Sequence, residues 1–435
     1  MGVFKFSMKM LKKEYKKAVV YAFTLMFTIM ASFIFFEIMN NEHLQATEKA
    51  YGGGSFADVS APLVTMLAFL IIIFCCFMII FANNFFLQNK HKELAIMSIS
   101  GVNFIQLTAY LVYQTAVLIL IVMPLGLLFG YLLCIITHSI MFNTLGITAS
   151  IYKVTLAAFT DTLWTIIIIL GCVLFYSCGY IYRNDVQAML SQQTVNEKED
   201  TRIFKFPRIV YVFVYIFGII LMLFSDYSTS IFIIPCVIGV AGTIGIMKYV
   251  FPDWIAKIKR KFFIGDKTNL IAVSNLSYSL KESIMLISLY CISCTGMSAI
   301  LIGQQGDIKN FITGVLGYAV MIILLSVAIL YKYISEIMDR KIFFFNLYKL
   351  GYVKKQLSKI IRNEVILYYA TIIVVPLIYI VIMFLRCFIH GDVTIAFGII
   401  LLLVVIVPPI FVGFITYFNY KNVVLKTIEG GIRYE

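Results

Sequence analysis

The sequence contains few charged residues and few histidines. Asp, Glu, Lys and Arg make up 13% of its 435 residues, and there are 4 histidines, whereas 61% of the residues are apolar. Soluble domains carry about 25% charged and about 45–50% apolar residues. The composition argues against a soluble enzyme, a secreted domain and a disordered chain. It predicts an all-α integral membrane protein.

Motifs for catalysis, nucleotide binding and metal binding are also missing. Gly265-Asp266-Lys267-Thr268 is the nearest approach to a Walker A motif, but it lacks the upstream glycine and the spacing. No His-Glu-x-x-His occurs, and the histidines lie in four different segments. We therefore predict that the chain is not an enzyme and holds no metal or cofactor. The net charge of +13 is not gathered with aromatics in a soluble segment, so no nucleic-acid partner is expected.

Ten apolar runs are long enough to predict about ten transmembrane helices, since about 20 residues cross the hydrocarbon layer. They lie near residues 18–39, 61–87, 104–138, 154–182, 208–225, 229–250, 282–303, 310–333, 359–386 and 394–418. Before them, residues 1–17 carry Phe4, Met8, Leu11 and Tyr15 at helical spacing among lysines. This pattern predicts an interfacial amphipathic helix that lies on the lipid bilayer.

Positive charge is distributed unevenly between the two sides that these spans define. With the N-terminus inside, all but four of the 35 Lys and Arg residues fall on the cytoplasmic side. The exceptions are Lys49, Lys153, Lys309 and Arg386. The positive-inside rule then predicts a multi-pass protein of the cell membrane with both termini in the cytoplasm.

Two segments, 91–102 and 341–352, resemble each other and suggest an internal repeat. Each reaches a glycine, Gly101 or Gly351, and then enters a long span in which Gln106 matches Gln356 at an offset of 250. A short helix that ends at a glycine cap can lie across the membrane face, where a soluble partner can contact it. We favour such a coupling element over an ordinary connecting turn.

Other features within the spans have a packing or a functional interpretation. Pro124 and Pro376 are candidate hinges in the third and ninth spans. Asp161 is a candidate intramembrane polar site, with an interfacial polar contact as the alternative. Close helix packing is expected at two sets of glycines: Gly126 and Gly130 in the third span, and Gly239, Gly242 and Gly245 in the sixth.

The segment around Gly101 resembles a turn found in FtsX-like ABC permeases, and the span plan resembles their bacitracin-resistance (Bce-type) subfamily. The matching residues are Lys92, Glu93, Leu94, Ala95, Ile96 and Gly101, with Lys349 and Gly351 in a degenerate second copy that has Phe343 in place of Glu93. The resemblance implies that these residues contact an ATPase. It divides the chain into an interfacial helix (1–17), a first FtsX-like four-helix unit (18–190), two central spans (191–281) and a second unit (282–435). The large extracellular domain usual between spans seven and eight is missing.

The resemblance further implies a permease that works with a soluble ABC ATPase in two copies, which would bind ATP and Mg²⁺. A membrane histidine kinase is a further implied partner. The implied role is the handling of amphipathic or antimicrobial peptides, free or lipid-bound, in bacterial antibiotic resistance. Three alternatives stay open: an exporter of an endogenous peptide such as a bacteriocin or signal, an ion-coupled carrier that uses Asp161, and a regulator that moves no substrate. The sequence identifies no substrate-binding residues.

Overall fold

The computed structural model describes residues 3–13, 15–41, 43, 75–80, 82–84, 86–87, 90–183, 207–224, 233–262, 265–303, 308–391 and 393–430. Nearly all of these residues are helical, and none of them lies in a β-strand. The chain divides into two compact units, residues 1–204 and 205–435. The structure of each unit is described by itself.

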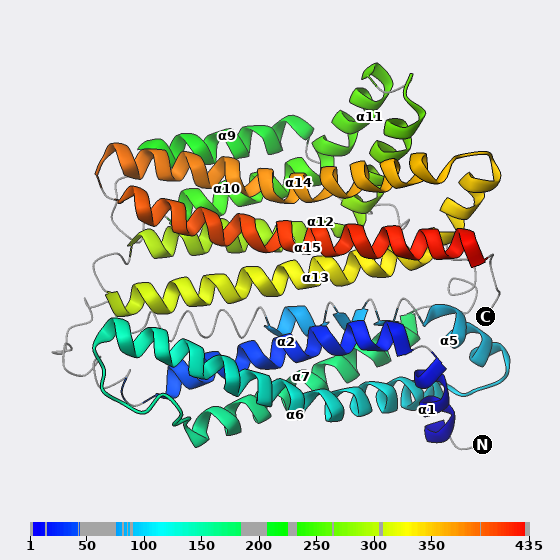
Figure 1. Cartoon of the computed structure of the whole chain (residues 1–435), viewed down its shortest axis with the longest axis horizontal. Coiled ribbons are helices and arrows are strands. Elements are labelled where there is room, and N and C mark those ends of the chain that lie inside the picture. The colour runs from blue at the N-terminus through cyan, green and yellow to red at the C-terminus, as the bar shows by residue number, and fades with distance from the viewer. Residues whose placement is uncertain are drawn as a thin grey trace. The chain divides into compact units, whose positions relative to one another are not determined.

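The first unit is built around one buried helix. Its elements are α1 (Val3–Lys13), α2 (Tyr15–Asn40), a short apolar helix at Cys75–Asn84, α5 (His91–Ile99), α6 (Phe104–Leu145) and α7 (Leu156–Arg183). Helix α2 packs against both α6 and α7 (Figure 1). In its membrane span 72% of the residues are buried, compared with 28% in α6 and in α7. The exposed surfaces of α6 and α7 are largely apolar, as expected for helices that face lipid.

The second unit has two buried helices with others around them. Its elements are α9 (Arg208–Phe224), α10 (Ile233–Gly245), a π-helical turn η2 (Ile246–Val250), α11 (Phe251–Phe262), α12 (Lys267–Gly303), α13 (Ile308–Lys349), α14 (Lys354–Ile389) and α15 (Ile395–Gly430). Helix α12 packs against α13 and α14, and α15 packs against α13 and α14. In the spans of α12 and α13, 61% of the residues are buried, compared with 33% in α14 and 28% in α15.

Eight of the described helices are long and apolar enough to cross a bilayer. The second and fifth predicted spans correspond to the shorter apolar helices Cys75–Asn84 and Arg208–Phe224. The predicted all-α membrane architecture is confirmed. The chain is a multi-pass membrane protein. Residues 304–307, which lie between the seventh and eighth predicted spans where the outer domain is missing, are outside the described part of the chain.

Glycines bring neighbouring helices into close contact in both units. A methyl group on Gly126 of α6 would lie 2.8 Å from Ile29 Cγ2 of α2, and one on Gly242 of α10 would lie 2.6 Å from the backbone of Tyr215 on α9. Gly130, Gly239 and Gly245 likewise face Phe33, Tyr379 and Tyr211. The predicted small-residue packing faces are confirmed.

The N-terminal helix α1 packs on α6. The Ser7 hydroxyl donates to the backbone oxygen of Tyr110 at 3.0 Å, and the Gln114 amide donates to the backbone oxygen of Ser7 at 3.2 Å. Of the four residues that the sequence assigns to the lipid-contacting face, Phe4 and Tyr15 are exposed, whereas Met8 and Leu11 are half-buried. Tyr15 begins α2 rather than continuing α1, and the Phe4 ring lies 5.5 Å from that of Tyr113 on α6. One face of α1 therefore holds it on α6, and its contact with lipid stays a prediction.

Candidate functional site

The segment around Gly101 forms a helix followed by a left-handed turn. Helix α5 ends where the backbone N–H groups of Ser100, Gly101 and Val102 donate to the oxygens of Ile96, Ser98 and Met97. Gly101 has φ +83°, a conformation that strains any residue with a Cβ. The Asn103 N–H then donates to the Gln106 side chain at 3.4 Å at the start of α6. The predicted glycine cap is confirmed.

The segment around Gly351 repeats this geometry at an offset of 250. The N–H groups of Leu350, Gly351 and Tyr352 donate to the oxygens of Asn346, Tyr348 and Leu347, and Gly351 has φ +96°. The Val353 N–H donates to the Gln356 side chain at 3.1 Å at the start of α14. One difference appears. The sequence suggests a separate short helix here, whereas residues 341–349 continue α13 without a break.

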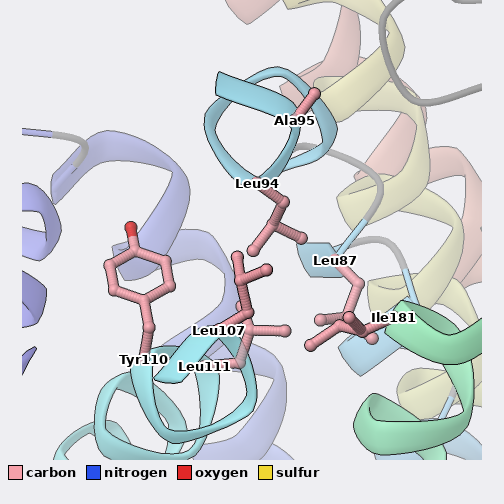
Figure 2. Packing of buried hydrophobic residues seen from close by; sticks show 7 residues of the cluster. All are labelled: Leu87, Leu94, Ala95, Leu107, Tyr110, Leu111 and Ile181. Carbon is pink, nitrogen blue, oxygen red and sulfur yellow. The ribbon is translucent and has the colours of Figure 1, made fainter. Parts of the chain in front are cut away.

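Apolar packing fixes α5 on the first unit. Leu94 and Ala95 are buried in a cluster with Leu87, Leu107, Tyr110, Leu111 and Ile181. Figure 2 shows Leu94 pointing from α5 toward Leu107 and Leu111 of α6. The equivalent residue of the second unit, Phe344, is buried too, and its ring lies 5.5 Å from that of Tyr420 on α15. Leu94 and Ala95 are thus placed to position the turn rather than to face a partner.

Glu93 forms internal contacts. Its Oε2 lies 3.0 Å from Lys90 Nζ, and the Tyr110 hydroxyl donates to the same oxygen at 2.8 Å. The Lys90 side chain is 1% exposed and that of Glu93 is 17% exposed. A charge-assisted contact of this kind joins α5 to α6. Sequence reasoning missed it, although Lys90 stands one helical turn before Glu93.

The outer faces of both turns are apolar and exposed. Ile96 is 61% exposed and Ile99 63%, and Leu350 of the second turn is 77% exposed. Further exposed apolar residues flank them: Phe104, Ile105, Ile342, Phe343 and Val353. Lys349 is exposed, with its Nζ 4.7 Å from the Phe345 ring centroid. The Lys92 side chain lies outside the described part of the chain. Among the predicted coupling residues of the first turn whose side chains the structure describes, Ile96 is therefore the one most accessible to a partner.

A buried ionic network lies on the part of α13 that precedes the second turn. Arg340 Nη1 contacts Glu364 Oε1 of α14 at 2.5 Å, and Glu336 Oε1 contacts Lys332 Nζ at 2.7 Å. Arg340 Nη2 also approaches Glu336 Oε2 at 3.4 Å and donates to Ser279 of α12 at 2.9 Å. The network joins α12, α13 and α14. Arg340 stands 250 residues after Lys90, so each turn follows a basic residue held in an ion pair.

Sequence reasoning did not identify this network. The spacing of Lys332, Glu336 and Arg340 at i, i+4 and i+8, directly after a long apolar run, is a signal for it. Glu364 is a further acidic residue in an apolar span, and its side chain is completely buried. What the sequence does not show is that α12 and α14 supply the partners.

A second polar cluster lies within the first unit and includes Asp161. Asn40 of α2 donates to Asp161 Oδ2 at 2.8 Å. Nearby on α2, buried Glu37 accepts from the Thr155 backbone at 2.9 Å and lies 3.6 Å from His138 Nε2. The sequence places His138 in no site, but the structure brings it to Glu37. These contacts tie α2 to the connection between α6 and α7, and a functional role for Asp161 stays a prediction.

Pro124 and Pro376 both lie inside continuous helices, α6 and α14. Each therefore removes one backbone donor in mid-span. Whether either is a hinge stays a prediction. Among the described residues, no three His, Cys, Asp or Glu side chains are grouped as a metal site requires.

The apolar helices and the two related glycine turns define the class of the protein, which is a multi-pass, all-α membrane protein. Residues 65–184 match the FtsX-like permease C-terminal family. Over 162 residues the chain is 28% identical to YvcS of Bacillus subtilis (strain 168), described as an uncharacterized ABC transporter permease. That alignment covers 37% of this chain and 23% of the relative, so the match spans about a quarter of that protein.

The first unit therefore contains a segment, residues 65–184, that is similar to the FtsX-like permease C-terminal family. This segment includes the Gly101 turn, α6 and α7. The predicted resemblance is confirmed for this part of the chain. The Bce-type assignment stays a prediction, as does an FtsX-like second unit.

Proposed function

We propose that the chain is the membrane-spanning subunit of an ABC transporter that works with a separate soluble ATPase, which binds ATP and Mg²⁺. One observation carries the proposal: two glycine turns, 250 residues apart, share a backbone hydrogen-bond pattern and expose apolar side chains. Two such turns provide one contact for each of two ATPase copies. The FtsX-like match over the first turn supports the same conclusion.

The turns connect to the membrane helices through apolar packing, hydrogen bonds and an ion pair. In the first unit, Leu94 and the Glu93–Tyr110 hydrogen bond join α5 to α6. In the second, α13 runs through the membrane span into the turn, and Arg340 ties it to Glu364 of α14. A push on either turn by a closing ATPase dimer would move whole helices, because packed interiors deform little.

The proposed orientation places both turns and both termini in the cytoplasm of a bacterial cell. The basis is the distribution of Lys and Arg, of which all but four lie on that side. A membrane histidine kinase is a further proposed partner.

The proposed substrates are amphipathic peptides, including antimicrobial peptides bound to lipid. The resemblance of the whole span plan to Bce-type permeases supports amphipathic peptides as the substrate class. The export of an endogenous peptide is compatible with the same permease and ATPase. A panel of peptides added to the purified permease–ATPase complex separates the classes. Stimulation of ATP hydrolysis by antimicrobial peptides alone favours resistance, and stimulation by an endogenous peptide alone favours export.

An ion-coupled carrier is a second candidate, which one observation favours. Glu37 and His138 are both fully buried, 3.6 Å apart, in the unit that holds Asp161. Proton and ion pathways use such intramembrane groups. The Glu37 carboxylate, however, already accepts from the Thr155 backbone and from Asn41 at 3.2 Å, which gives it a structural role.

Co-purification tests the proposed function. The tagged chain, isolated from its native membranes in mild detergent after crosslinking, should carry a soluble Walker-motif ATPase in a ratio of two to one. Recovery of the chain without any ATPase would overturn the proposal. A gradient-driven flux that is lost in Asp161→Asn would then support the carrier.

A further inference from the structure

A basic pocket lies between the first turns of α14 and the last turns of α15. Its volume is about 350 Å³. Five cationic side chains line it, together with one acidic side chain, Glu429; the cations are Lys354, Lys355, Lys359, Arg362 and Lys421. Five cations around one small hollow indicate a site for an anion.

The positive charge of the pocket is largely uncompensated. Lys354 Nζ contacts Glu429 at 2.8 Å on the exposed surface. Lys355, Arg362 and Lys421 form no ion pair within the described residues. A further acidic residue, Asp266 at the start of α12, interacts with the charge of Lys359. Hydrogen bonding from Thr268, assisted by the charge of Lys359, lowers the pKa of Asp266 below its ordinary value. Its carboxylate accepts from Thr268 and Asn269, so it is already engaged.

Beyond the residues that line the pocket, the same face of each helix carries exposed apolar side chains. On α14, Lys355, Lys359, Arg362 and Ile366 follow the spacing i, i+4, i+7 and i+11, and Ile366 is 57% exposed. On α15, Phe414, Phe418, Lys421 and Leu425 follow the same spacing, and the two Phe side chains are about 60% exposed. Basic and apolar surfaces thus adjoin within about two helical turns.

The internal repeat with an offset of 250 residues does not include the basic residues of the pocket on α14. The positions of the first unit that match Lys355, Lys359 and Arg362 are Ile105, Ala109 and Val112. The Gly101 turn and the start of α6 form there without any basic residue. The equivalent positions of the first unit thus lack the basic residues of the pocket, and the geometry of the turn does not explain the pocket.

We propose that this pocket binds the phosphate of an anionic phospholipid, whose acyl chain lies along Ile366, Phe414 and Phe418. The proposed orientation puts the pocket at the inner leaflet, where anionic lipids attract basic surfaces. A soluble acidic protein would fit the charges but not the exposed apolar residues that continue from them. Inorganic phosphate shares the headgroup chemistry and is distinguished by experiment.

The test is a binding titration on the purified full chain in mild detergent, by thermophoresis, without any ATPase. The ligands are dioctanoyl phosphatidylglycerol, dioctanoyl phosphatidylcholine and inorganic phosphate. We expect saturable binding of phosphatidylglycerol, with at least about tenfold weaker binding of the other two. Lys359→Gln with Arg362→Gln should weaken phosphatidylglycerol binding by about tenfold or more, since each basic residue near a lipid surface contributes about fivefold.

Two further variants sharpen the test. Lys281→Gln with Lys426→Gln removes two exposed cations of the same unit outside the pocket and should leave binding unchanged. Glu429→Gln removes the one acid of the pocket and should tighten binding.

Three results would overturn the inference. Equal binding of both lipids excludes charge recognition, and phosphate binding as tight as phosphatidylglycerol binding assigns the pocket to the free ion. If Lys359→Gln with Arg362→Gln keeps lipid binding but loses a co-purifying protein, the surface belongs to that partner. Because the titration uses the chain alone, its failure would leave the proposed ATPase coupling standing.

Discussion

At the scale of single residues, Glu93 is the clearest case in which the structure refines an interpretation from sequence. The resemblance to FtsX-like permeases assigns Glu93 to ATPase contact. In the structure its carboxylate holds Lys90 and Tyr110, and the adjacent Ile96 offers the more exposed surface. We infer that Glu93 acts first by fixing α5 on α6, so its loss would affect coupling through the position of the turn.

Replacement of Glu93 by Ala should lower the free energy of unfolding by about 1–3 kcal/mol, because buried Lys90 and Tyr110 lose a charged partner. Tyr110→Phe removes one hydrogen bond and should cost less, about 1 kcal/mol. Tyr113→Phe, three residues further along α6, is the control and should have no effect. Thermal unfolding of the detergent-solubilised chain measures all three. Equal stability of Glu93→Ala and Tyr113→Phe would show that the contact does not hold the turn.

The buried ionic network of the second unit leads to a comparable prediction about the free energy of unfolding. Glu364→Ala leaves Arg340 without its closest acidic partner and should cost about 3 kcal/mol, the usual penalty for breaking a buried pair. Glu429→Gln breaks the exposed pair with Lys354 and should leave stability unchanged, because water and salt screen it. The same unfolding assay compares the two. A Glu364→Ala variant as stable as Glu429→Gln would mean that the network does not join α13 to α14.

At the scale of elements, the helices and the glycine turns could be predicted from the sequence. Long apolar runs have few alternatives to membrane helices, and a glycine after a short helix is a frequent left-handed cap. The continuity of α13 through residues 341–349 could not be predicted, since the resemblance to the first segment suggested a separate helix. The partners of Arg340 could not be predicted from the sequence, because they depend on which helices pack against α13.

The two turns should respond alike to substitution. Gly101→Ala and Gly351→Ala each force a side chain into φ +83° or +96° and should cost about 1–2 kcal/mol, although neither methyl group meets another atom within 4 Å. Gly265→Ala also meets open space, without a left-handed backbone, and is the matched control. Unfolding midpoints measured on all three variants test the repeat. A loss at one turn alone would show that the two turns are not equivalent.

At the scale of the whole molecule, the two units share an order of elements but differ in chemistry. In each, a buried helix packs against a long helix that starts after the glycine turn, α6 or α14. The first unit holds its turn through Glu93, and the second through Arg340 and a continuous α13. The second also has a basic pocket between the start of α14 and the end of α15, where the equivalent α6 positions Ile105, Ala109 and Val112 of the first unit are not basic. We infer that two equivalent contacts with an ATPase would act on two differently reinforced bundles.

Site-specific photo-crosslinking tests the central claim most directly. A photoreactive residue at Ile96 or Leu350 lies on the exposed face of a turn, whereas one at Leu156 or Ile389, each 79% exposed, lies at the opposite end of its unit's long helices. The account predicts that a Walker-motif ATPase is crosslinked in native membranes from Ile96 and Leu350, and not from Leu156 or Ile389. Crosslinks from Leu156 and Ile389, or none from the two turns while the ATPase still co-purifies, would contradict it.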